Sequence, residues 1–129
     1  MYSWTVYNDV YSWTVYIYKE DVMKRHKLLP LTETMHYILL ALRKPLHGYA
    51  IMQEVETMSN GEVRIAAGTL YGAIENLLKY NWIVLVPSDD PRRKTYRITD
   101  EGLEILEIEK RRFLHILSLY EGGSIDDKA

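Results

Sequence analysis

The sequence of 129 residues contains no cysteine. Without thiols the chain cannot form a disulfide scaffold, a thiolate zinc site or a cysteine nucleophile, and this absence fits a reducing cytoplasm. No apolar run approaches the ~20 residues that a membrane-spanning helix needs. The N-terminus also lacks the positively charged region of a secretory signal. We therefore predict a cytoplasmic protein with no membrane partner.

A strong excess of charge of one sign is missing as well. Sixteen Lys and Arg stand against eighteen Asp and Glu, which gives a net charge of -2. This balance excludes a uniformly basic coat, so any DNA-binding surface must be a local patch. The composition, 47% hydrophobic and 26% charged, is that of a globular domain, and the length suits one domain with appendages.

Signatures of catalysis and metal binding are absent from the sequence. No Gly-x-Ser-x-Gly motif, P-loop or dinucleotide fingerprint occurs. None of the histidines forms a pair at i,i+4, and no acidic residue completes a ligand set: His26, His36, His47 and His115. We predict that the protein is not an enzyme and that it carries no metal and no cofactor.

The first 22 residues contain a perfect repeat. Tyr2–Tyr7 recurs letter for letter as Tyr11–Tyr16, with Asn8 and Asp9 between the copies. Aromatic and β-branched residues around a turn are typical of a hairpin, although an isolated hairpin is marginal in water. We interpret residues 1–22 as an atypical extension that is not part of the folded domain. The alternative is an aromatic arm that packs on a partner or on DNA.

Helix signals begin shortly after this extension. Apolar residues at helical spacing predict a first helix over residues 32–43, with Thr32 as its N-cap. A second helix follows Gly48 and ends near Ser59-Asn60-Gly61, a strong turn signal. Apolar residues then alternate with charges, which predicts a short strand at residues 63–65.

The rest of the chain completes a recognisable order of elements. We expect a third helix over residues 67–80, strands at 82–86 and 94–98 around the loop 87–93, and a final helix over 99–122. This order predicts a mainly α fold with a small β-hairpin, a winged helix-turn-helix. In that fold the third helix enters the DNA major groove, and the hairpin loop, or wing, lies along the backbone or minor groove.

The third helix has one apolar face and one small, polar face. The apolar face must pack on the core: Leu70, Ile74, Leu77 and Leu78. The opposite face carries Thr69, Gly72, Asn76 and Lys79, with Tyr71 on its flank. Thr69 and Asn76 can reach base edges, Lys79 and Tyr71 can reach phosphates, and Gly72 permits a close approach. The alternative is an ordinary solvated helix face.

The hairpin loop and its returning strand concentrate positive charge. Four basic residues fall within six positions, with an aromatic residue between them: Arg92, Arg93, Lys94, Tyr96 and Arg97. Such a cluster suits contact with phosphates, which releases counterions and makes binding sensitive to salt. Asp89 and Asp90 weaken the local field, so a merely solvated charge run is the alternative. We predict that Arg92, Arg93, Lys94 and Tyr96 contact DNA.

The final helix carries two separate apolar stripes. One contains Leu103, Leu106, Phe113, Leu114, Leu117 and Tyr120, and the other Ile105, Ile108, Ile116 and Leu119. A helix packed on one small domain needs a single stripe, so the second stripe indicates a second copy of the chain. We predict a homodimer through Leu103, Leu106, Phe113, Leu117 and Tyr120. A two-fold dimer implies double-stranded DNA with a pseudo-palindromic operator.

Three segments resemble the PadR family of bacterial transcriptional regulators: His47-Gly48-Tyr49, Gly68-Thr69-Leu70-Tyr71 and residues 92–102. The resemblance covers roughly residues 30–122. It implies a winged-helix dimer that represses promoters, often close to its own gene, and is released by a small molecule. It also implies DNA-facing roles for Tyr49, Thr69, Tyr71, Arg92 and Arg93. Gly72 departs from the pattern, because many members carry proline there.

Within the short members of that family, the ligand can sit between the first and last helices. The matching positions here are Met35, Phe113, Leu117 and Tyr120. These residues are predicted to bind a small aromatic or drug-like effector, with dimer core as the alternative. We expect residues 23–98 to form the DNA-binding domain, residues 99–122 the dimerisation helix and residues 123–129 a polar tail. The alternative function is a winged-helix module that binds proteins and not DNA.

Overall fold

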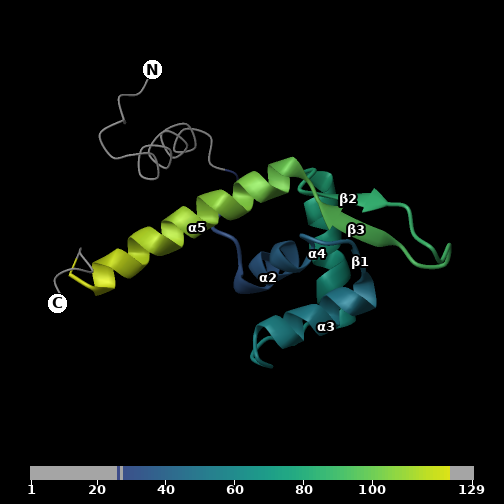
Figure 1. Ribbon diagram of the computed structural model, residues 1–129, viewed down its shortest axis with the longest axis horizontal. Coiled ribbons are helices and arrows are strands. Elements are labelled where there is room, and N and C mark those ends of the chain that lie inside the picture. Colours follow the sequence, from purple (N-terminus) through teal and green to yellow (C-terminus); the bar gives the residue numbers. More distant parts are fainter. Residues whose placement is uncertain (1–25, 27, 123–129) are drawn as a thin grey trace, which may run out of the picture. The chain divides into compact units, whose positions relative to one another are not determined.

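The computed structural model describes residue 26 and residues 28–122. Their elements are α2 (Glu33–Ala41), β1 (Leu46–His47), α3 (Gly48–Met58), α4 (Ala67–Lys79), β2 (Ile83–Val86), β3 (Thr95–Ile98) and α5 (Asp100–Tyr120) (Figure 1). The predicted winged helix-turn-helix with a mainly α composition is confirmed. The hairpin predicted in residues 1–22 and the polar tail at 123–129 lie outside the described residues.

By its internal contacts the chain divides into two compact units, and the boundary falls inside α5. One unit is Leu31–Leu106, and the other takes up α5 from Glu107 onward. The predicted boundary at residues 98 and 99 is close to the start of α5 but not to the edge of the first unit. The first turns of α5 belong to the winged unit because Leu106 is buried and Gly102 packs against Trp82.

Residues at the helix ends explain where the helices begin and stop. The Thr32 hydroxyl accepts a hydrogen bond from the Met35 N–H at 3.1 Å, as predicted for the N-cap of α2. Asn60 and Asn81 follow α3 and α4 with φ of 55° and 62°, in the left-handed region. The residue after each asparagine ends the helix with a backbone hydrogen bond to the carbonyl five residues earlier. The Gly61 N–H donates to the Glu56 carbonyl, and the Trp82 N–H donates to the Leu77 carbonyl.

The sheet has three antiparallel strands in the order β1-β3-β2. Its central strand pairs Tyr96 with Leu46 on one side and with Leu85 on the other. The prediction of a strand at residues 63–65 is wrong. These residues form no strand, and the third strand of the sheet is Leu46–His47. The backbone of Val63 instead bonds in both directions with the buried Ser59 hydroxyl, which holds this segment against the end of α3.

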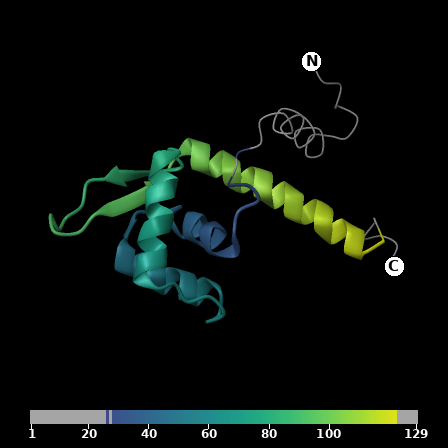
Figure 2. The same cartoon turned by 180° about the vertical axis from the view of Figure 1, so that it is seen from behind.

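The core of the winged unit lies among the helices and one face of the sheet. Helix α2 packs on α3, α3 on α4, and α4 on β2. The side chains that these contacts bury are Ile38, Leu39, Leu42, Ile51, Val55, Leu70, Ile74, Leu77, Trp82, Ile83 and Ile98. The loop between β2 and β3 projects away from this core (Figures 1 and 2). Its residues are therefore free to meet another molecule.

No helix in the described part of the chain is long and apolar enough to span a membrane. Across the same residues, no three His, Cys, Asp or Glu side chains are grouped so that they could hold a metal ion.

Candidate nucleic-acid interface

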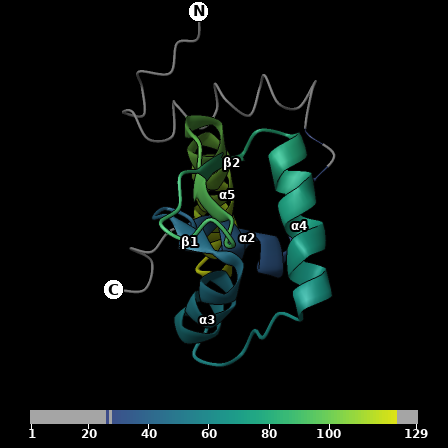
Figure 3. The ribbon, with the colours of Figure 1, turned by 90° about the vertical axis from the view of Figure 1, so that its right-hand side faces the viewer.

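The outer face of α4 is exposed in the way that its pattern predicts. Leu70, Ile74 and Leu77 are buried, which fixes the rotation of the helix about its axis. The opposite side leaves Thr69, Gly72, Glu75, Asn76 and Lys79 exposed. In Figure 3 the hairpin loop faces the viewer, with α4 beside it and α3 below. The exposure is confirmed, and contact of these residues with DNA stays a prediction.

Hydrogen-bonding groups on this face are left unused by the part of the chain that the structure describes. Among the described residues, the Thr69 and Asn76 side chains make no hydrogen bond. The Lys79 ammonium lies 5.5 Å from the centre of the Tyr80 ring and remains exposed. Ala66, the N-cap of α4, offers no side-chain acceptor, so the first N–H groups of the helix stay open. Unused donors at an exposed helix end suit base edges and phosphates.

The wing presents its arginines around a single aspartate. Asp90 accepts a 2.9 Å bond from the Arg92 N–H, and its carboxylate lies 3.3 Å from the Arg92 Nε and 3.8 Å from the Arg93 Nε. The Arg92 backbone and side-chain bonds, with the charge of Arg93, hold the pKa of Asp90 below its usual value. The Arg92 side chain is 88% exposed and that of Arg93 58%. Lys94 is exposed too, so Asp90 orients this cluster without covering it.

Tyr96 does not join this surface. It lies on the central strand and is only 5% exposed, and burial raises the pKa of its phenol, with a further contribution from Tyr71. The prediction that Tyr96 contacts DNA is corrected, because strand alternation turns Arg97 outward and Tyr96 inward. Tyr96 supports the interface from beneath.

His47, Gly48 and Tyr49 lie at the junction of β1 and α3, where His47 contacts Arg93 of the wing. His47 ends β1, opposite Thr95 of β3, and its Nδ1 accepts from the Ala50 N–H at 3.4 Å as the N-cap of α3. Tyr49 is 60% exposed at the start of α3. The Arg93 Nη1 lies 3.0 Å from the His47 Nε2. This contact between His47 and the wing was not predicted from the sequence.

Gly48 makes room for Tyr71. A Cβ on Gly48 would collide with the Tyr71 hydroxyl, which lies across from it on α4. The Tyr71 side chain is 53% exposed, so its ring can swing away at little cost.

We therefore expect Gly48→Ala to change the unfolding free energy by less than about 1 kcal/mol, because a flexible side chain yields. It should weaken DNA binding several-fold, since Tyr71 would leave its place beside α3. Thermal unfolding and fluorescence anisotropy with a labelled duplex measure the two effects. Unchanged affinity would show that the position of Tyr71 does not matter for binding.

The residues predicted for dimerisation and for an effector divide into buried and exposed sets. Met35 is 8% exposed and Leu106 9%, so both belong to the core of the winged unit and not to an open surface. A residue that lines an internal ligand site is buried as well, so the roles predicted for Met35 and Leu106 stay predictions. Exposed apolar side chains remain along α5: Leu103, Phe113, Leu114, Ile116, Leu117, Leu119 and Tyr120.

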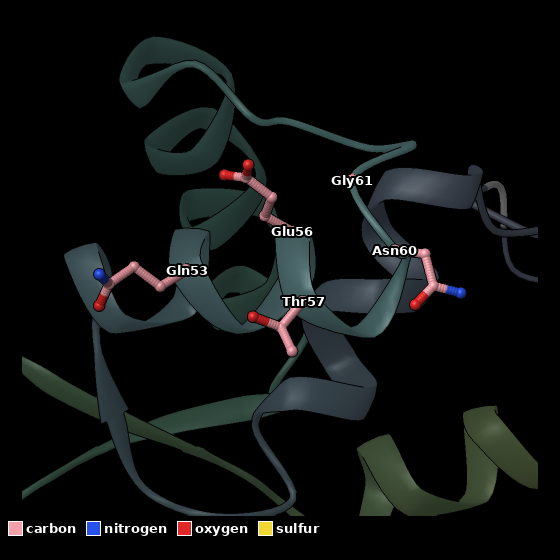
Figure 4. A pocket seen from close by; sticks show the side chains of 5 residues that line it. All are labelled: Gln53, Glu56, Thr57, Asn60 and Gly61. Atoms are coloured by element: carbon pink, nitrogen blue, oxygen red, sulfur yellow. The ribbon is translucent and has the colours of Figure 1, made fainter.

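A shallow pocket lies elsewhere, at the C-terminal end of α3. Its lining is polar and comprises Gln53, Glu56, Thr57, Asn60 and Gly61 (Figure 4). The Glu56 carboxylate is paired with the Arg64 Nε at 3.2 Å. None of the residues predicted to bind an effector lines this pocket.

Comparison with known proteins shows the family to which the chain is similar. Residues 38–108, more than half of the chain, match the model of the transcriptional regulator PadR-like family. An uncharacterized protein X of Lysinibacillus sphaericus is 38% identical over 66 residues, which are 49% of this chain. The matched region spans 61% of that relative's length.

Solved structures of regulators share the fold. A PadR family transcriptional regulator from Eggerthella lenta is 26% identical with a TM-score of 0.54, covering 92% of this chain and 94% of that one. A PadR family transcription regulator from Clostridium difficile, also 26% identical with a TM-score of 0.54, covers 69% and 97%. A transcriptional regulator from Clostridium thermocellum, 22% identical with a TM-score of 0.59, covers 69% and 86% and supports the fold alone.

Proposed function

The chain belongs to the PadR-like family of transcriptional regulators, and we propose that it binds promoter DNA by inserting α4 into the major groove. The family places it among regulators and not among enzymes. In this proposal Thr69 and Asn76 read base edges, while the wing residues Arg92 and Arg93 lie along the phosphate backbone.

One observation carries the proposal. The exposed face of α4 has hydrogen-bonding side chains without partners in the described chain, and a basic, exposed wing belongs to the same compact unit. The small, polar side chains of α4 and the basic wing favour a partner that carries phosphates. Apart from the neighbouring residues of its own helix, nothing lies within 4 Å of the place where a Cβ on Gly72 would stand, so the backbone of α4 is open to a close approach.

We extend the proposal to a two-fold dimer through α5. Phe113 is 49% exposed, Leu117 49% and Tyr120 84%, and a soluble monomer rarely leaves so many large apolar side chains uncovered. The partner that fits a long apolar helix of this kind is a second copy of the same helix. A dimer would present two copies of α4 to a pseudo-palindromic operator.

Repression of a nearby promoter, with release by a small aromatic or drug-like molecule, completes the proposal. The support is the family, together with the exposed aromatic side chains Phe113 and Tyr120, which suit stacking on an aromatic ligand. A thermal-shift screen of aromatic compounds, followed by a test of DNA release, would examine this part on its own.

The first experiment is a titration of the full chain into labelled duplex from its own upstream region, beside a scrambled duplex, at two salt concentrations. Tight, selective and salt-sensitive binding would support a local regulator. Equal weak binding to both duplexes would point to a remote operator. No binding at low salt would contradict DNA recognition and favour the protein-binding alternative.

A charge placed in the α5 surface should break the dimer. We expect Phe113→Glu/Leu117→Glu to sediment as a monomer at micromolar concentration, because two carboxylates would have to be buried in the interface. His115→Glu, on the exposed polar face of the same helix, is the matched control and should stay dimeric. A wild-type protein that sediments as a monomer would refute the dimer.

A further inference from the structure

The ring of His47 faces two hydrogen-bond donors at once. Its Nδ1 lies 3.4 Å from the Ala50 N–H, and its Nε2 lies 3.0 Å from the Arg93 Nη1. A neutral imidazole has one N–H and one lone pair, and a charged one has two N–H groups. His47 can therefore accept from at most one of these donors, and the other contact sets donor against donor.

One tautomer of His47 satisfies the helix cap. The backbone of His47, with φ -91° and ψ 169°, is extended as an N-cap requires, and its Nδ1 is the acceptor for the first turn of α3. The Arg93 side chain is 58% exposed, and its Nε lies 3.8 Å from the Asp90 carboxylate. In the tautomer whose Nδ1 accepts for the cap, the proton of His47 lies on Nε2 and points at the Arg93 guanidinium.

Two donors that converge from different elements mark a place for an acceptor. His47 comes from the junction of β1 and α3, and Arg93 comes from the wing. The Tyr71 hydroxyl lies beside Gly48, the next residue along the chain, and adds a third donor nearby. The positive end of the α3 dipole and the charge of Arg93 both favour an anion there.

We propose that the His47 Nε2–H and the Arg93 guanidinium together bind one backbone phosphate of the DNA. This inference rests on the proposed function and adds a residue to it. An oxygen of the phosphate accepts from both groups, so the unfavourable contact of the free protein becomes two favourable ones. Because His47 pairs with Thr95 across the sheet, the same phosphate would fix the wing relative to α3.

A pair of isosteric substitutions separates this role from capping. In His47→Asn the side-chain oxygen stands near the place of Nδ1, so the cap survives and the outer donor is lost. In His47→Gln the amide nitrogen stands near the place of Nε2, so the outer donor survives and the cap is weakened. The expected result is a roughly tenfold weaker affinity for His47→Asn and an affinity within about twofold of wild type for His47→Gln.

The thermal midpoints of the two variants should show the reverse of their order in DNA affinity. His47→Asn should be as stable as wild type, and His47→Gln should be less stable. A purely structural role for His47 would make affinity follow stability. Binding by His47→Asn equal to that of wild type would overturn the inference, as would an equal loss in both variants.

The nature of the contact gives two further readouts. A phosphate carries no sequence, so His47→Asn should weaken binding to the upstream and scrambled duplexes alike, with the salt dependence unchanged because no charge is removed. If His47 and Arg93 share one phosphate, the double variant His47→Asn/Arg93→Gln should lose less than the product of the single losses. Losses that multiply would contradict a shared phosphate.

Nitrogen NMR of the histidine rings tests the free protein directly. The inference requires a protonated Nε2 and an unprotonated Nδ1 at His47 before DNA is added, and the opposite tautomer would overturn it. Inorganic phosphate, added in place of DNA, shows whether a free anion occupies the site equally well. A shift of the His47 ring with duplex, and none with inorganic phosphate at the same concentration, assigns the site to the DNA backbone. Failure of the wild type to bind any duplex would instead contradict the proposed function.

Discussion

Reversing the charge of the wing, by Arg92→Glu/Arg93→Glu, should lower the affinity for every duplex by more than about 100-fold near 0.1 M salt. Both guanidinium groups are largely exposed and lie together around Asp90, so they form an accessible positive patch on the winged unit. The substitution replaces two cations with two anions beside an existing carboxylate. The slope of log K against the logarithm of the salt concentration should become shallower by roughly 3 to 4, because a dimer would lose two cations from each protomer.

The matched control is Arg92→Lys/Arg93→Lys, which keeps the charge and should retain most of the affinity. Anisotropy titrations over a series of salt concentrations measure both quantities. Because these side chains are exposed, the thermal midpoint should hardly change in either variant. A loss confined to one sequence, with an unchanged salt slope, would mean that the wing reads bases and does not follow the backbone.

The helices and the wing could be predicted because their signals are local. Apolar spacing placed α4 within one residue of its ends, and the Asn-Gly turn after α3 marked the end of that helix. The rotation of α4 followed as well, since three buried residues on one face leave only one side for solvent. These features depend on neighbours within a few positions along the chain.

Features that depend on distant segments were missed or misplaced. Strand β1 has only two residues, Leu46 and His47, and exists because β3 pairs with it from across the unit. Tyr96 resembled a wing residue by sequence, but the central position of β3 buries it. The contact of His47 with Arg93 joins positions 46 residues apart, so no local pattern could reveal it.

The start of α5 was predicted within one residue, but its contact with the turn after α4 was not, and this contact bears on stability. Thr99 caps the helix by accepting from the Gly102 N–H at 3.0 Å, and its hydroxyl donates to the Asn81 carbonyl at 2.6 Å. The Trp82 carbonyl accepts from the Thr99 N–H at 3.0 Å and lies directly against Gly102. The turn after α4 and the first turn of α5 are thus in backbone contact, which only a glycine at position 102 permits.

Gly102→Ala should therefore destabilise the protein by about 2–3 kcal/mol, because its Cβ would strike the Trp82 carbonyl and come within 2.6 Å of the Ile98 Cγ1. Backbone cannot yield as a side chain does, so the thermal midpoint should fall by on the order of 10 °C at fixed protein concentration. Gly72→Ala is the control, since its Cβ meets nothing within 4 Å and alanine favours a helix interior. It should raise stability by about 0.5–1 kcal/mol and, where α4 lies close against DNA, weaken binding. Equal stability of the two variants would mean that α5 does not need its contact with Trp82, and that the winged unit ends before Gly102.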